Sequence, residues 1–336
     1  MADLRYDPNS DVWVAISSKR RERPMEFIPI EQKHQQIICP FCSGNEDETP
    51  PPIIAYREDG EPLTPEDNPS SWLSRVVNNK YPSLSDANGS DQCGPYDCSS
   101  SDGVQELVIP TPRHVVSISE LTDAELQLCF KACQQRLSAL REQENIKHIV
   151  LFLNCRSSAG ASLEHIHFQI MGSPILSQFL SQRAARNRAS VAENGKSLIA
   201  NLMDWELEQG VRILHESDNF TMFCPYASRF AFQVWIVPKD ASRRFDQYEQ
   251  GGEEMRRELS ELCCDYVRRL ENLLDSPAYN FLVNFAPVQQ GEHEHWFVEI
   301  FPRLNRMAGY EIGTNIWVNP VPPETAAKRL RSAIVD

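Results

Sequence analysis

The residues best suited to chemistry lie in one stretch, Ser162-Leu163-Glu164-His165-Ile166-His167-Phe168-Gln169-Ile170. If this stretch is a β-strand, alternation sends His165, His167 and Gln169 to one face and the apolar residues between them to the other. A neutral imidazole is a good nucleophile towards phosphorus because its unperturbed pKa lies near 6.5, and a nearby carboxamide can donate to an anion. We therefore expect His167 to be a nucleophile. The alternative is a half-exposed strand with two incidental histidines.

Two cysteines at residues 39–42, in Cys-Pro-Phe-Cys, form a second motif. Two thiolates at this spacing supply half of a tetrahedral zinc site, and the other half must come from elsewhere. A thioredoxin-type redox motif is the rival interpretation, but it requires a helix directly afterwards. Residues 43–52 are a poor helix start, so zinc is favoured. His114 follows a predicted strand, and its local context indicates an incidental histidine more than a ligand.

Two further segments could bind phosphate. Four cations lie within residues 19–23, including Arg20 and Arg23. They fit a solvated loop as well as a phosphate site, and the local sequence does not decide between the two. The Gly- and Ser-rich loop 156–162 can offer backbone N–H groups and hydroxyls to phosphate oxygens.

Composition limits the class of protein. The 336 residues carry 41% hydrophobic and 24% charged residues and a net charge of −14. Such an acidic chain argues against nucleic acid as a partner, because phosphate backbones are bound by clustered Lys and Arg. No apolar run is long enough for a bilayer and no signal peptide is visible at the start, so we expect a cytoplasmic protein without a membrane partner. The ten cysteines then fit core positions and metal ligands better than disulfides.

Hydrophobic periodicity predicts the same order of elements twice: strands, a helix, then paired strands. Thr122 and Glu125 form a capping box that opens a helix running to about Glu144. Further helices are expected over 174–209, with a break near Asn194-Gly195, and over 250–275. Strands are expected near residues 11–16, 72–82, 106–110, 148–154, 162–170, 211–215, 219–224, 231–238, 279–286 and 295–301.

This repetition indicates an ancient duplication in which one copy kept the chemistry. We predict an N-terminal half over residues 1–185, with the zinc site and catalytic strand, and a duplicated C-terminal half over 186–336. The second half carries Glu292-His293-Glu294-His295 at the place of the first half's His-x-His, and no Gln follows in register.

Taken in order, these motifs resemble the galactose-1-phosphate uridylyltransferase family, a two-copy branch of the histidine-triad superfamily. The resemblance covers about residues 5–333, and no single motif is decisive. The motifs are Asp11-Val12-Trp13-Val14 leading to Arg20 and Arg23-Pro24, Cys39-x-x-Cys42, Asn79, Pro112-x-His114, Asn154, the run Gly160 to Gln169, Phe232 to Pro238, and Ala308-Gly309-Tyr310-Glu311.

The resemblance implies an α+β fold of two histidine-triad-like halves, each an antiparallel half-barrel sheet with packed helices. It also implies one structural zinc ion per chain, held by Cys39, Cys42, His114 and His165. Cys2His2 is a closed set of ligands, so the metal would position the strand and not activate water.

By the same resemblance, His167 attacks the α-phosphorus of UDP-glucose, and the uridylyl-histidine passes its nucleotide to galactose 1-phosphate in a ping-pong cycle. Gln169 would donate to a phosphoryl oxygen and Ser162 to the departing phosphate. A homodimer is implied, because in the family the sugar-binding residues reach in from the other subunit. The substrate-binding residues implied are Arg20, Arg23, Asn79, Asn154, Tyr310 and Glu311.

Several positions depart from the family pattern. Ile166 replaces the usual Pro between the two histidines, and Phe168 replaces a small residue. We expect no counterpart of the second metal site found in some members, because the second half has no Cys-x-x-Cys and Phe297 and Glu299 lie where histidines often occur. These changes keep open a nucleotide-binding protein that has lost turnover.

Lys80 follows Asn79 where the typical uridylyltransferase has an acidic residue. This change and the ending after Gly309 also resemble the ADP-glucose phosphorylase branch, in which inorganic phosphate accepts an adenylyl group. The sequence leaves open the base, the sugar and the acceptor, since fold and family do not fix the substrate.

Overall fold

The structure of the chain is a computed structural model. It describes residues 2–18, 38–84, 101–240, 242, 244–247, 252–288, 295–304 and 306–333. The predictions made for Arg20, Arg23 and His293 lie outside these described residues.

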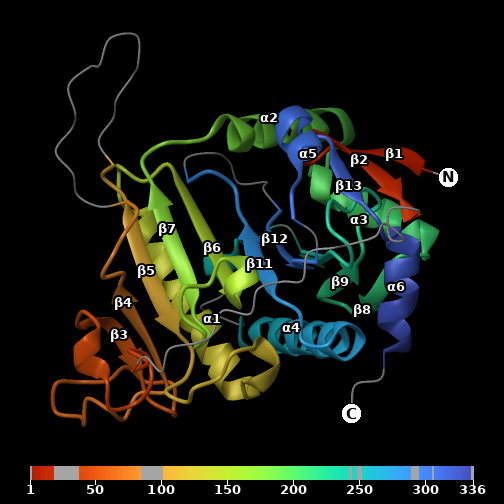
Figure 1. The fold of residues 1–336 in the computed structure, drawn as a ribbon. Helices are drawn as coiled ribbons and strands as arrows, with labels where there is room; N and C mark the ends of the chain where they lie inside the picture. Colours follow the sequence, from red (N-terminus) through yellow and green to blue (C-terminus); the bar gives the residue numbers. More distant parts are fainter. Residues whose placement is uncertain are drawn as a thin grey trace.

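The described chain is built around one 10-stranded antiparallel sheet with strand order β3-β4-β5-β7-β6-β11-β12-β10-β9-β8 (Figure 1). Its strands are β3 (Pro52–Tyr56), β4 (Ser74–Asn78), β5 (Val104–Ile109), β6 (His148–Cys155), β7 (Phe168–Ser173), β8 (Ile213–Glu216), β9 (Phe220–Phe223), β10 (Val234–Pro238), β11 (Tyr279–Asn284) and β12 (Phe297–Pro302). The helices are α1 (Asp123–Arg141), α2 (Gln178–Asn194), α3 (Leu198–Gln209), α4 (Gly252–Leu274), α5 (Gly309–Thr314) and α6 (Pro323–Ser332).

The strand order is the same in both halves when each is followed from its outer edge. β3, β4, β5, β7 and β6 correspond to β8, β9, β10, β12 and β11, and the two halves join where β6 pairs with β11. α1 precedes β6 as α4 precedes β11. The α+β prediction is confirmed, and the two half-sheets are continuous through the β6–β11 ladder. The division near residue 185 stays a prediction; that residue lies within α2.

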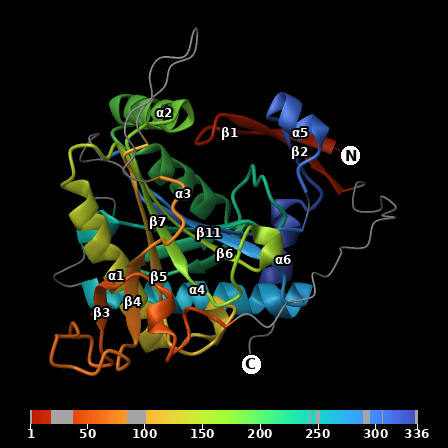
Figure 2. The same ribbon diagram turned by 60° about the vertical axis from the view of Figure 1, so that its left-hand side comes forward.

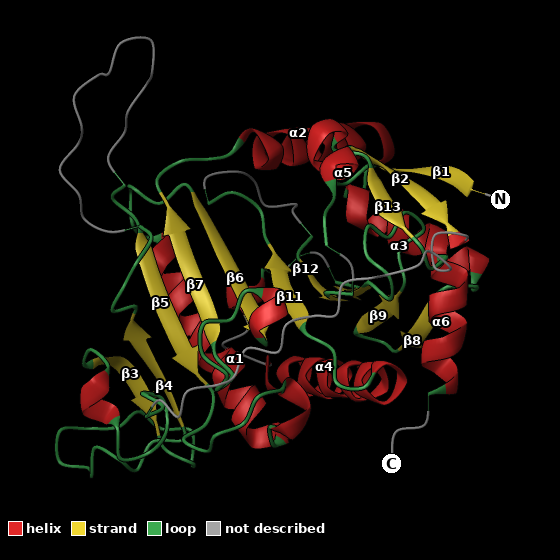
Figure 3. Ribbon diagram, in the orientation of Figure 1, coloured by secondary structure: helices red, strands yellow, loops and turns green. Residues whose placement is uncertain are grey.

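Helices α1 and α4 cover one face of the sheet (Figure 3). The main core forms there, where Phe130 of α1 and Tyr266 of α4 are buried with Phe168, Phe281 and Ile300 of the central strands. Burying such large apolar side chains is the main favourable term for this face.

The opposite face is covered differently in the two halves. In the first half, Phe41 packs with Leu107 and Ile109 of β5. In the second half, Ile199 and Met203 of α3 pack against β9, β10 and β12. The segment that carries the two cysteines therefore occupies a sheet face that a helix covers in the other half.

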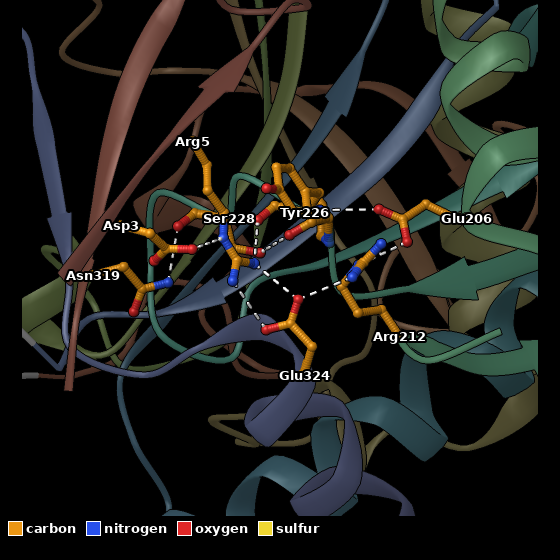
Figure 4. A network of polar contacts seen from close by, with 9 residues as sticks. Asp3, Arg5, Glu206, Arg212, Tyr226, Ser228, Asn319 and Glu324 are labelled. Atoms are coloured by element: carbon orange, nitrogen blue, oxygen red, sulfur yellow. Dashed lines mark hydrogen bonds and ion pairs between the residues drawn. The ribbon is translucent and has the colours of Figure 1, made fainter. Parts of the chain in front are cut away.

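A small sheet lies beside the second half, formed by β1 (Ala2–Asp7), β2 (Val12–Ser17) and β13 (Trp317–Asn319) in the order β1-β2-β13 (Figure 2). A polar network connects it to α6 (Figure 4): Arg5 of β1 donates to Glu324 of α6 at 2.8 Å, and Arg212 donates to the same carboxylate at 2.9 Å. The centroid of the Tyr226 ring lies 4.4 Å from the guanidinium carbon of Arg5 and 5.2 Å from that of Arg212. The network fixes β1, and β2 through its pairing with β1, against α6.

Most predicted elements are confirmed. The capping box at Thr122 and Glu125 is present with both of its hydrogen bonds. The predicted break at Asn194-Gly195 separates α2 from α3, and Gly195 ends α2 in the left-handed conformation, which glycine adopts without strain.

The strand predicted over 162–170 is wrong at its start, because β7 begins at Phe168. On one side, the ladder to β5 ends where Val108 pairs with Phe168, shortly before Pro110, which has no N–H to donate. On the other side, β6 ends before Arg156, which has a positive φ of 68°. His165 and His167 therefore lie in the segment that leads into the strand.

No helix in the described ranges is long and apolar enough to cross a membrane.

Candidate active site

Cys39, Cys42, His114 and His165 come together in one cluster, with their candidate ligand atoms all within 4.8 Å of one another. Nδ1 of His165 lies 3.5 Å from Sγ of Cys39, and Nδ1 of His114 lies 3.3 Å from Sγ of Cys42. Two sulfurs and two imidazole nitrogens are the ligand set of a closed tetrahedral zinc site. The four residues could therefore hold a metal ion.

The tautomer of His165 suits a ligand. Its Nε2 donates to the carbonyl of Thr111 at 3.0 Å, which leaves the lone pair of Nδ1 directed at the cysteines. Burial lowers the pKa of His165 to about 4, which keeps the ring neutral. Burial raises the pKa of Cys42 to about 11, and Cys39 beside it adds to the effect. A bound cation would supply the positive charge that favours the thiolate form.

The turn formed by residues 39–42, here called the cysteine turn, is held by hydrogen bonds to its backbone. Nδ2 of Asn45 donates to the carbonyl of Cys39, and the buried Arg75 donates to the carbonyl of Pro40 at 3.1 Å. The N–H of Ser43 donates to the carbonyl of Pro112, beside His114. These contacts place the cysteines against the loop that carries the third ligand.

Backbone pairing brings His114 to His165. The N–H of Ile166 donates to the carbonyl of Val115 at 2.8 Å, so the two chain segments run side by side. The prediction from local sequence, that His114 is incidental, is overruled by this pairing. The ligand set inferred from the family resemblance is thus assembled in space.

His167 is buried two residues further along. Its Nδ1 donates to the carbonyl of His165 at 2.9 Å, which leaves Nε2 with a free lone pair. Burial lowers the pKa of His167 and favours the neutral ring. The ring of Phe41 packs against it with centroids 5.1 Å apart, and also against His165 at 5.9 Å. The cysteine turn and the candidate nucleophile are therefore in direct contact.

Gln169 points its carboxamide toward β5, where its Oε1 accepts from Nε2 of Gln105 at 3.0 Å. Among the described residues its own Nε2 has no acceptor. Asn79 lies at the end of β4; its N–H donates to the carbonyl of Gln105, and its side-chain oxygen accepts from the N–H of Tyr81.

Asn154 supports the loop 156–162. Its Oδ1 accepts from Nδ2 of Asn280 at 2.7 Å, and the same Asn280 donor reaches the carbonyl of Ala159 at 2.9 Å. Ser162 at the end of this loop is exposed. Asn280 thus fixes a loop that can present N–H groups to an anion.

Tyr310 and Glu311 are not brought to this site within one chain. Both lie on α5, which is beside β1, β2 and β13 and away from β5 and β7 in both views (Figures 1 and 2). Glu311 accepts from the N–H of Ala308 and caps the helix, while Tyr310 is exposed. A role in the site of this chain would require another copy of the chain.

The second half holds a changed version of the site. A shift of 130 residues superposes the β6–β7 ladder on the β11–β12 ladder. It carries the pair Leu153 and Phe168 onto the pair Val283 and Val298, and these four side chains all lie in the main core. His165 then corresponds to His295, and not to His293 two residues earlier, as the sequence pattern predicted. His295 is bound by Ser197 in place of cysteines, and its Nε2 donates to the carbonyl of Pro238.

By the same shift, Phe297 occupies the position of His167 and Glu299 that of Gln169. Glu299 accepts from Arg229 at 2.9 Å, a closed ion pair. The chemistry-bearing residues are therefore gathered in the first half.

Sequence reasoning missed the residues that hold the site together: Phe41, Gln105, Thr111 and Asn280. The signal for Gln105 was present, since it is a polar residue that shares a strand face with Leu107. The roles of Thr111 and Asn280 depend on contacts between distant segments, for which the sequence carries no pattern.

The fold and the site define a duplicated histidine-triad protein, and comparisons with known proteins agree. The chain belongs to the family described as "Domain of unknown function (DUF4921)", whose model matches residues 111–336, and it lies among the galactose-1-phosphate uridylyltransferase-like proteins. It is 29% identical to an ADP-glucose phosphorylase of Arabidopsis thaliana, over 98% of this chain and 92% of the relative. It is 27% identical to a galactose-1-phosphate uridylyltransferase of Thermotoga maritima over the whole of both chains.

The solved structures give the same picture. The crystal structure of an ADP-glucose phosphorylase from Arabidopsis thaliana with bound ADP-glucose matches with a TM-score of 0.82 and 27% identity, covering all of both chains. The comparisons therefore establish the class of this protein: it is one of the galactose-1-phosphate uridylyltransferase-like nucleotidyl-transferring enzymes.

Proposed function

We propose that this protein transfers a nucleotidyl group from a nucleotide sugar through a covalent intermediate on His167. The observation that carries the proposal is the hydrogen bond from Nδ1 of His167 to the carbonyl of His165. It fixes the tautomer in which Nε2 is the unprotonated nitrogen, and burial lowers the pKa of His167 and so favours this neutral form.

The reaction would proceed in two displacements at the same phosphorus. The lone pair of Nε2 attacks the α-phosphorus, the bond from that phosphorus to the bridging oxygen breaks, and the sugar 1-phosphate leaves with the electron pair. An oxygen of the acceptor phosphate then attacks, the P–N bond breaks, and Nε2 regains its lone pair. The proton stays on Nδ1 throughout, hydrogen-bonded to the carbonyl of His165.

The other residues of the site would stabilise phosphate charge. Nε2 of Gln169 is free to donate to a non-bridging oxygen, and the exposed Ser162 can donate to the departing phosphate. By the family resemblance, Arg20 and Arg23 would neutralise charge that the transition state spreads over oxygens.

The metal cluster would act on position and not on the reaction itself. A zinc ion held by Cys39, Cys42, His114 and His165 would fix the segment that leads into β7. It would not bind substrate, because four protein ligands leave no open position. Phe41 would pass this rigidity to His167 through ring packing.

Two donor and acceptor pairs fit this chemistry. The first is ADP-glucose with inorganic phosphate as acceptor, supported by the likeness to the phosphorylase and by Lys80 after Asn79. The second is UDP-glucose with galactose 1-phosphate, supported by the full-length likeness to the uridylyltransferase. A homodimer in which Tyr310 and Glu311 serve the partner's site, and a cytoplasmic location, remain proposals.

The test is intact-protein mass spectrometry after incubation with ADP-glucose and, separately, UDP-glucose, without an acceptor. Gain of an adenylyl group that phosphate discharges supports the phosphorylase reaction. Gain of a uridylyl group that galactose 1-phosphate discharges supports the uridylyltransferase. Absence of any adduct contradicts both and favours a binding protein without turnover.

The nucleophile is tested by His167→Ala, which should abolish the adduct. His215→Ala is the matched control, because His215 lies on β8 in the second half. An adduct that persists in His167→Ala contradicts the assignment.

A further inference from the structure

Gln105 of β5 connects two parts of the candidate site. Its backbone carbonyl accepts from the N–H of Asn79 at 2.9 Å, and its side-chain Oε1 accepts from the N–H of Ser83 at 2.8 Å. Its Nε2 donates to Oε1 of Gln169 at 3.0 Å. Gln105 is about 9% exposed, so solvent competes little for these bonds.

The two side-chain hydrogen bonds of Gln105, from Ser83 and to Gln169, form a relay. The bond from Ser83 fixes its direction. A backbone N–H can only donate, so the group of Gln105 that faces Ser83 must be the oxygen. The amide nitrogen of Gln105 must then face Gln169 and donate to it. The oxygen of Gln169 is thereby held toward β5, and its nitrogen is left for another acceptor.

The second half repeats the relay. The N–H of Phe230 donates to Oε1 of Gln233 at 3.1 Å, and Nε2 of Gln233 donates to Oε1 of Glu299 at 2.5 Å. A carboxylate can only accept, so the direction in this copy is certain from the residue types alone.

The ladder geometry is the same in both copies. Gln105 pairs with Met171, two residues beyond Gln169. Gln233 comes one residue before Val234, whose ladder partner is Ile300, so it lies opposite the residue two positions beyond Glu299. The same diagonal contact thus recurs across corresponding strands.

We propose that Gln105 is a positioning residue that fixes the carboxamide of Gln169 with its N–H donor directed at the phosphoryl group. This inference rests on the proposed nucleotidyl transfer. In the second half, the acceptor that ends the relay is a carboxylate paired with Arg229, and a carboxylate has no N–H of its own to offer a phosphate. In the first half, the relay ends at the amide of Gln169, whose N–H donors the relay does not use.

The test reverses the direction of the relay. In Gln105→Glu the carboxylate still accepts from the N–H of Ser83 but cannot donate, so it draws the nitrogen of Gln169 toward itself and turns the oxygen to the phosphate. Removal of one preorganised donor to a developing anion costs about 100- to 1,000-fold in rate. We expect the single-turnover rate of adduct formation to fall by about 100-fold, with little change in the KM for the nucleotide sugar. Gln105→Met frees the amide of Gln169 to take either orientation and should lower the single-turnover rate roughly two- to fivefold.

A cycle with Gln169→Ala separates positioning from a structural role. If Gln105 acts through Gln169, adding Gln105→Glu to Gln169→Ala slows adduct formation no further. If Gln105→Glu slows adduct formation by the same factor in the wild type and in Gln169→Ala, the proposal is overturned. The matched control is Gln233→Met, which breaks the same contact in the second half and should leave the rate unchanged.

A second readout does not depend on catalysis. Hydrogen exchange of the ¹⁵N-labelled side-chain amide of Gln105, assigned by its loss in Gln105→Met, should be slow in the wild type and faster in Gln169→Ala. If the wild type forms no adduct, the proposed function fails while slow exchange still supports the relay. Exchange at the rate of a free amide overturns the relay whatever the activity.

Discussion

Replacement of Phe41 by leucine asks whether the cysteine turn positions the candidate nucleophile. Phe41 is 3% exposed and packs against the rings of His165 and His167. It also packs with Leu107 and Ile109 on the sheet face that the cysteine turn covers. A leucine keeps most of the apolar volume and removes the flat ring surface against which His167 rests.

The structure sets the expected magnitudes. Truncation of Phe41 to alanine would cost about 3–5 kcal/mol, which is large against a total stability of about 5–15 kcal/mol. A volume-conserving change costs less than about 1.5 kcal/mol, and the lost aromatic contact adds about 0.5–1.5 kcal/mol. For 336 residues the entropy of unfolding is roughly 0.7 kcal/mol per kelvin, so about 2 kcal/mol lowers the melting temperature by roughly 3 °C.

The rate should fall by more than this loss of stability suggests. A misplacement of about 1 Å in a reacting group can cost about 100-fold, and a leucine permits a smaller movement of the ring. We expect the single-turnover rate of nucleotidyl-enzyme formation to fall roughly tenfold, measured by intact-protein mass spectrometry well below the melting temperature.

Phe223→Leu is the matched control. Phe223 is 1% exposed and packs with Trp235 in the cluster that contains Phe297, the residue at the position of His167 in the second half. It should lower the melting temperature by a similar amount and leave the rate within about twofold. If both variants lose the same stability and both keep the rate, the cysteine turn does not position the nucleophile.

Two further predictions concern the metal and the network of Figure 4. Elemental analysis should find about one zinc per chain; Cys39→Ser should lose it and lower the melting temperature, whereas Cys155→Ser should keep it, and absence of zinc from an unchelated wild-type preparation would contradict the site. Burial acts to raise the pKa of Glu324, but hydrogen bonds from Arg5 and Arg212 outweigh it and hold the pKa below its ordinary value of 4.5. Because the pKa is lower in the folded state, this carboxylate stabilises the fold fully above about pH 4.5 and less as the pH falls. The difference in unfolding free energy between wild type and Glu324→Gln, measured in urea, should therefore shrink on acidification; a constant difference would refute the pairing.

The sequence determined much of the secondary structure, because those signals are local. Thr122 and Glu125 predicted the start of α1 correctly, since a capping box needs only residues three apart. Alternation placed Ile166, Phe168 and Ile170 in the core, and the structure buries all three there. Alternation could not show where the ladder begins, because β7 starts only where β5 and β6 both offer partners.

The sequence also indicated half of the metal cluster. The spacing of Cys39 and Cys42 is a local signal, whereas His114 joins them only through the backbone pairing of Ile166 with Val115. Such a contact between residues 51 positions apart leaves no periodicity to read.

Tertiary structure alone decided the tautomers and the direction of the amides. Which nitrogen of His167 is free depends on the carbonyl of His165, and the orientation of Gln169 depends on Gln105 on a neighbouring strand. A sequence names donors and acceptors, but only their pairing in space determines which of them is left over for a substrate. For this protein the sequence supplied the reacting groups, and the fold decided which of their atoms can react.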